Sequence, residues 1–176
     1  MPLTAAAGSI SLAVDNLRVT LADSAAFRTW SGTSTQAAAL ARIYYESLPP
    51  PTDKNEHTLV ELTALRPYAA VWTDEFDGFT YRQDAALSTP KESGTMLIKF
   101  EQTVDPTIVN DYPEISRRFI NAIGTIIEEV MDFYNVGGYL AIEQATLMKF
   151  GRGDPDERSA MGDYMAAVVK CEWGQR

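Results

Sequence analysis

The chain has only one cysteine, one histidine and no long run of apolar residues. The single Cys171 excludes a disulfide within the chain, and with only one histidine, His57, zinc sites of the Cys/His type are excluded as well. No segment approaches the roughly 18 apolar residues of a membrane-spanning helix, so we expect no contact with a membrane. The G-x-S-x-G motif is absent, and no third glycine follows Gly151-Arg152-Gly153, so the signatures of a serine hydrolase and of a dinucleotide site are missing.

Basic residues are also in deficit, with 15 Lys and Arg against 24 Asp and Glu and a formal charge of −9. Proteins that bind nucleic acids or anionic membranes present clustered Lys and Arg. We therefore expect no sequence-specific nucleic-acid binding. His57 lies in a polar connector and is expected at the surface, whereas Cys171 lies in an apolar alternation that predicts a small buried side chain. We predict no catalytic residue, no cofactor and no metal.

The strongest pattern in the chain is an amphipathic helix over residues 111–134. Apolar side chains recur there every three or four residues, and the predicted inner stripe comprises Ile115, Phe119, Ala122, Ile126, Val130 and Phe133. Asp111 is placed to cap the first turn, with Glu114 three residues later. Gly137-Gly138 ends the helix, because glycine readily adopts the left-handed geometry of a helix C-terminus.

The rest of the chain predicts helices first and strands later. An N-terminal pair of helices is expected at about 9–21 and 35–47, with Pro49-Pro50-Pro51 ending the second. Period-two alternation predicts a hairpin over 67–83 and strands at 95–104, 139–150 and 160–173. These elements predict one α+β domain over 1–176, with an antiparallel sheet of about four to five strands on which the long helix and the N-terminal pair pack. Residues 1–8 are expected to form a flexible arm and 151–158 a long hairpin loop.

Charged residues gather in two of the predicted turns, and exposed loops of this kind often carry binding residues. The turn at 74–78 lacks the ligand alternation and the final glutamate of a calcium loop, so it is interpreted as a plain hairpin turn. The candidate interface residues are Arg152, Asp154, Asp156, Glu157 and Arg158 in the long loop, and Asp74, Glu75 and Asp77 in the hairpin turn.

Four segments, taken with the order of elements, carry a family resemblance. They are AALARIYYESL (38–48), LRPYAAVWTD (65–74), GTMLIKFE (94–101) and MAAVVKCEWG (165–174). The chain resembles tail terminator and tail completion proteins of tailed phages. The resemblance implies a structural subunit of a closed ring, a hexamer, that caps the tail tube and joins it to the head or neck.

The same resemblance implies the partners and the location. The partners are copies of the chain itself, the tail-tube protein and the neck or head-completion proteins, while DNA passes through the lumen of the ring. The protein is expected in the host cytoplasm during assembly and then in the virion. The family has no catalytic residues to carry over.

Two other functions stay open at this point. One is a monomeric protein-binding adaptor module, which the oligomeric state distinguishes from a ring subunit. The other is a small enzyme that uses Asp or Glu carboxylates and Tyr, whose mark is a concave pocket with carboxylates of shifted pKa. The acidic pair Glu128-Glu129 is expected on the solvated face of the long helix, so an enzyme is disfavoured.

Overall fold

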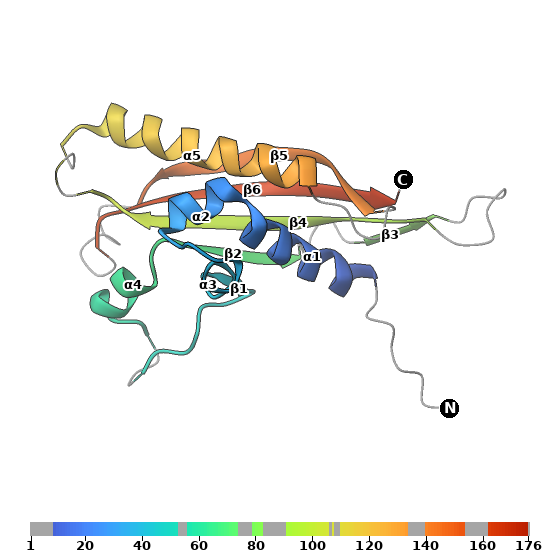
Figure 1. The fold of residues 1–176 in the computed structure, drawn as a ribbon, viewed down its shortest axis with the longest axis horizontal. Coiled ribbons are helices and arrows are strands. Elements are labelled where there is room, and N and C mark those ends of the chain that lie inside the picture. Colours follow the sequence, from blue (N-terminus) through green and yellow to red (C-terminus); the bar gives the residue numbers. More distant parts are fainter. Residues whose placement is uncertain are drawn as a thin grey trace.

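In the part of the chain that the computed structural model describes, six strands form one sheet, and helices α1, α2 and α5 lie across one face of it (Figure 1). The structure describes residues 9–52, 56–73, 79–82, 91–105, 107, 110–133, 140–153 and 162–175. In chain order the elements are α1 (Ser9–Asp23), α2 (Ala25–Ser31), α3 (Gln36–Leu40), β1 (Ile43–Tyr45), α4 (Leu59–Leu65), β2 (Tyr68–Thr73), β3 (Phe79–Arg82), β4 (Lys91–Thr103), α5 (Tyr112–Phe133), β5 (Leu140–Arg152) and β6 (Tyr164–Gln175).

The strand order of the sheet is β1-β2-β4-β6-β5, and β3 pairs with β4 outside this path. β1 runs parallel to β2, and the other pairings among the described strands are antiparallel. The predicted α+β class, with a mostly antiparallel sheet, a long helix packed on it and helices at the N-terminus, is confirmed.

The core lies between the sheet and the helices α1, α2 and α5. Helix α5 begins one residue after Asp111, whose Oδ1 accepts the Glu114 N–H at 3.1 Å, as the predicted cap requires. The buried residues of α5 recur at helical spacing and comprise Ile115, Phe119, Ile123, Ile126 and Val130. They meet alternate residues of β4 and β6, namely Met96, Ile98, Phe100, Met165, Ala167, Val169, Cys171 and Trp173. Burial raises the pKa of the Cys171 thiol to about 12, so this side chain is the buried hydrophobe that its alternation predicts.

The predicted hairpin over 67–83 is wrong, although both of its strands exist. β2 pairs with residues 96–101 of β4, and β3 pairs with residues 91–94 of the same strand. The two strands therefore follow one another along one side of β4 and run in the same direction. Alternation of apolar residues shows that a segment is a strand, but it does not show which strand it pairs with.

The predicted second helix over 35–47 is also wrong in its second half. Helix α3 ends at Leu40, and Ile43-Tyr44-Tyr45 form β1 beside β2. β-branched and aromatic residues suit a pleated surface, and pairing with β2 outweighs the helical spacing of the apolar residues.

Helix α4 was missed by the sequence analysis, although the chain contains its start signal. The Thr58 N–H donates to Glu61 at 2.7 Å, and the Glu61 N–H donates to Thr58 Oγ1 at 3.3 Å. This reciprocal pair is a capping box, and the Ser/Thr-x-x-Glu pattern could have located the helix.

Helix α2 is held against α5 by Ser24 and Glu129. Ser24 Oγ accepts the Phe27 N–H at 2.9 Å and donates to Glu129 Oε2 at 2.7 Å, while the Ala26 N–H donates to the same oxygen at 3.1 Å. These hydrogen bonds hold the pKa of Glu129 below its usual value, and the bond from Ser24 has the largest effect. The expectation of a purely solvated Glu129 is therefore wrong, whereas Glu128 is exposed as expected.

Replacing Glu129 by alanine is expected to lower the free energy of unfolding by about 1 kcal/mol, because two donors at the start of α2 lose a charged acceptor on a partly exposed surface. Glu128→Ala, the matched control on the neighbouring residue, should leave that free energy within about 0.5 kcal/mol of the wild type. Urea denaturation followed by circular dichroism measures both. Equal losses of unfolding free energy in the two variants would show that the hydrogen bonds between α2 and Glu129 do not contribute to stability.

The predicted arm 1–8, the turn 74–78 and residues 154–158 of the predicted loop lie outside the described residues. β5 itself continues as far as Arg152, so the first two residues of that predicted loop belong to a strand. Within the described part of the chain, no helix is long and apolar enough to cross a membrane.

Candidate functional site

Strand β5 is the long unpaired edge of the sheet. It has 13 residues, and among the described strands only β6 pairs with it. Its pairing register shifts between Ile142 and Gln144 and again between Leu147 and Lys149. An open edge presents a row of unpaired backbone groups, to which another strand can add, and natural proteins usually shorten, cover or charge such an edge.

The second half of β5 exposes large apolar side chains. Leu147 is 39% exposed, Met148 59% and Phe150 42%. Leu147 is paired with Val169 and Phe150 with Ala167, both of which are buried under the helices. Directly paired residues share a face of the sheet, so Leu147 and Phe150 lie on the helix side but beyond the cover of α5. Exposed apolar side chains grouped beside an open strand are characteristic of a contact surface.

Of the eight predicted interface residues, only Arg152 is described. It closes β5, and its Nε donates to Asp163 Oδ1 at 2.5 Å, with a second contact from Nη2 to Oδ2. The Asp163 carboxylate holds the pKa of the guanidinium above its usual value. Arg152 is thus engaged with the residue just before β6, and its role at an interface stays a prediction. The other seven residues, Asp74, Glu75, Asp77, Asp154, Asp156, Glu157 and Arg158, lie outside the described residues.

A buried ionic cluster lies on the face of the sheet opposite to α5. Glu101, whose side chain is fully buried, accepts hydrogen bonds from Arg66 Nε at 2.7 Å and Tyr68 Oη at 2.8 Å, and pairs with Lys99 Nζ at 2.7 Å. Arg66 also lies 4.4 Å from the centre of the Tyr164 ring. Burial alone would raise the pKa of Glu101, but the hydrogen bonds and charges of Lys99 and Arg66 outweigh burial and hold it below its usual value.

Sequence analysis missed this cluster because its members come from three separate segments. Lys99 and Glu101 alternate with the apolar residues Ile98 and Phe100, and the polar face of such a strand is ordinarily interpreted as solvated. The sequence contains only a weak signal of this cluster. Arg66 and Tyr68 lie at the start of β2, and Lys99 and Glu101 occupy alternate positions of β4, with which β2 pairs. Arg66 and Lys99 both pair with the Glu101 carboxylate here.

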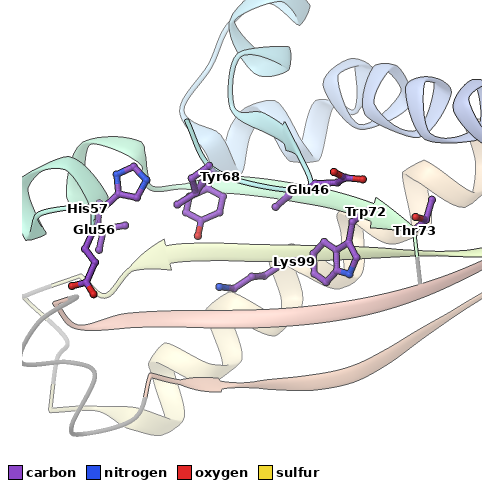
Figure 2. A pocket seen from close by; sticks show the side chains of 10 residues that line it. Glu46, Glu56, His57, Tyr68, Trp72, Thr73 and Lys99 are labelled. Atoms are coloured by element: carbon purple, nitrogen blue, oxygen red, sulfur yellow. The ribbon is translucent and has the colours of Figure 1, made fainter. Parts of the chain in front are cut away.

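Next to the cluster is a cavity of about 700 Å³. Its lining residues come from β2, β4, α4 and the segment before α4, and are Glu46, Leu48, Glu56, His57, Leu62, Tyr68, Ala70, Trp72, Thr73 and Lys99. Figure 2 shows Lys99 between Tyr68 and Trp72, with His57 and Glu56 at the end nearer α4. His57 is half-buried, and no described residue bonds to its Nδ1, so the expected surface histidine instead lines a cavity.

The chemistry of the cavity is that of a binding site with a mixed lining. Trp72, Tyr68 and Leu62 offer apolar surface, while Glu46, Glu56 and His57 offer polar groups, and the Lys99 ammonium is already paired with Glu101. Within the described residues, no group of three or more His, Cys, Asp or Glu side chains is arranged to hold a metal ion.

Comparison with known proteins adds no relative. No protein-family model matches the chain, and no curated protein sequence matches it.

Proposed function

We propose that this protein is a structural assembly subunit that associates with copies of itself, as a tail terminator-like protein of a tailed phage does. The observation that carries the proposal is the long open edge β5 with Leu147, Met148 and Phe150 exposed along it. A monomer would leave both the backbone groups and the apolar side chains of this edge in water, whereas a second copy removes them from water.

The element order supports the phage assignment. The resemblance to tail terminators implies N-terminal helices, a central hairpin, a strand, one long helix and two closing strands. The helices at the N-terminus, the long helix and the two closing strands occur in this order, whereas β2 and β3 pair with β4 and not with each other as a hairpin. In this proposal the copies close into a hexameric ring that caps the tail tube and meets the neck or head-completion proteins, and DNA passes through its lumen. The protein assembles in the host cytoplasm and remains in the virion.

Light scattering coupled to size-exclusion chromatography tests the proposal. The expected result for the protein alone is a species of six chains, 6 × 19.4 ≈ 116 kDa, which should become larger when tail-tube protein binds, and negative-stain images of it should show rings. A chain that stays monomeric in both conditions up to its solubility limit would overturn the proposal.

The cavity beside α4 favours a second candidate, a monomeric binding module. Its volume of about 700 Å³ is within the range of small-molecule pockets, and His57 Nδ1 is a buried polar atom without a described partner. A monomeric mass in the same light-scattering experiment would favour this candidate over the ring subunit. A ligand or peptide that binds in the cavity should then shift the NMR signals of His57 and Trp72.

A further inference from the structure

The cavity beside α4 has an aromatic floor with a cation in it. The floor lies on the face of the sheet opposite to α5, where Tyr68, Ala70 and Trp72 occupy alternate positions of β2. Alternate residues of a strand point to the same face, so the small Ala70 leaves space between the two rings. Lys99 is paired with Ala70 in the register of β2 and β4. Its side chain lies between the two rings (Figure 2), so aromatic surface and an ammonium group are combined in one floor.

A second wall of the cavity comes from α4 and from the segment before it. α4 contributes Leu62, and the segment contributes Leu48 and the half-buried His57. Together with the floor, this wall bounds a volume of about 700 Å³, which suits an organic molecule with several rings. A planar apolar body fits such a space, because its burial against the floor and the wall removes apolar surface from water.

Lys99 can donate hydrogen bonds to a ligand in this cavity. Its Nζ pairs with Glu101 Oε2 at 2.7 Å, and Arg66 Nη2 pairs with the other oxygen, Oε1, at 2.5 Å. Within the described residues Glu101 is the partner of the Lys99 ammonium, which has three N–H groups. The Lys99 side chain is 35% exposed and lines the cavity, so its remaining donors are accessible to a bound molecule.

The two carboxylates of the lining lie apart from this ammonium group. Glu46 accepts a hydrogen bond from the Tyr45 hydroxyl, and Figure 2 shows its carboxylate directed away from Lys99. Glu56 is exposed at the end of the cavity nearer α4, where solvent and salt screen its charge. A negatively charged group beside Lys99 therefore forms a charge-assisted hydrogen bond next to apolar walls, where such a bond is stronger than in water.

We propose that this cavity binds an aromatic carboxylate, whose carboxylate group pairs with Lys99 and whose rings lie over Ala70 against Trp72. The inference goes beyond the assembly function proposed above and does not depend on it. A monomer and a subunit of a ring carry the same cavity, so the oligomeric state does not decide whether the ligand binds.

Three probes of similar shape and different charge test the proposal. Naphthaleneacetate is an anion, naphthaleneacetamide is neutral and naphthylethylamine is a cation. Calorimetric titration of the full chain measures their affinities, and the NMR signal of Trp72 Nε1–H reports binding in the cavity. We expect saturable binding of naphthaleneacetate that is about ten-fold or more tighter than binding of the amide, which is the effect of one charge-assisted hydrogen bond. The amine should bind more weakly than the amide.

Substitutions locate the site and the origin of its charge preference. Lys99→Met should remove the preference, so that naphthaleneacetate and its amide bind with equal affinity. Lys170→Met is the matched control and should keep the preference, because Lys170 pairs with Glu172 at 3.4 Å on the same face of the sheet but outside the cavity lining. Ala70→Leu fills the space between the two rings and should abolish binding of all three probes.

The outcomes decide the proposal in either direction. It is overturned if no probe binds the wild type in a saturable way, if the anion binds no tighter than its amide, or if the Trp72 signal does not shift. An anion preference that survives in Lys99→Met, or disappears in Lys170→Met, also overturns it. Circular dichroism verifies that each variant is folded, because Lys99 also pairs with the buried Glu101. If Lys99→Met does not fold, the probes on the wild type and on Ala70→Leu decide.

Discussion

Ile126→Asp is expected to abolish cooperative folding. Ile126 is fully buried in the middle of α5, within the cluster formed by α1, α2, α5 and the sheet. A carboxylate at this position would either be an unpaired buried charge or have to bind a proton, and both cost free energy. The substitution also removes an apolar side chain from the core. The combined loss is about 4 kcal/mol or more, against a total stability of about 5–15 kcal/mol for a domain. Thermal unfolding followed by circular dichroism measures the effect.

Thr125→Asp is the matched control for this variant. It introduces the same charge at the preceding residue, which is exposed on the other side of α5. Its stability should stay within about 1 kcal/mol of the wild type, since the position is exposed and the substitution removes only the hydrogen bond from Thr125 Oγ1 to the Asn121 carbonyl at 3.0 Å. If Ile126→Asp melts cooperatively within a few degrees of Thr125→Asp, the helix does not pack on the sheet through this residue.

The long helix and the central strands were predictable because their signals are local. The apolar spacing in 112–133 and the cap at Asp111 lie within one continuous segment. The alternation of Met96, Ile98 and Phe100 needs no knowledge of the partner strand, since burial of one face alone imposes it. These elements carry most of the core, which is why the α+β class could be derived from the sequence.

The pairings that define the edges of the sheet were not predictable in the same way. β1 has only three residues, and its strand geometry depends on β2, which lies more than twenty residues further along the chain. β3 joins β4 rather than β2 because the partner is chosen by packing across the sheet and not by the sequence of the turn. The position of β5 at an edge of the sheet follows only from the complete strand order. The apolar residues Leu147 and Phe150 taken alone are equally typical of a covered strand, so the sequence does not show that they are exposed.

The ionic cluster around Glu101 also depends on tertiary structure, since its residues come from separate segments. Its loss is the second prediction with a large effect on stability. Glu101→Ala is expected to lower the free energy of unfolding by about 3–5 kcal/mol, because it leaves the Arg66 guanidinium buried without its carboxylate. The side chain of Arg66 is 1% exposed, so water cannot replace the lost partner. Chemical denaturation at neutral pH measures this loss. Glu172→Ala is the matched control, since Glu172 pairs with Lys170 at 3.4 Å on the same face of the sheet but is 46% exposed, and it should cost less than about 1 kcal/mol.

The pH dependence gives this prediction a second readout. The folded-state pKa of Glu101 lies below its ordinary value of 4.5. A depressed pKa means that the ionised form stabilises the fold at pH values above 4.5, and that this contribution is lost as the pH falls through the folded pKa. The difference in unfolding free energy between the wild type and Glu101→Ala should therefore be constant near neutral pH and shrink on acidification below 4.5.

Replacing both members of the pair, as in Glu101→Met/Arg66→Met, should recover part of the loss because no unpaired charge remains buried. A double variant as unstable as Glu101→Ala, or a difference that does not change with acidification, would show that Glu101 acts through its shape and not through its charge.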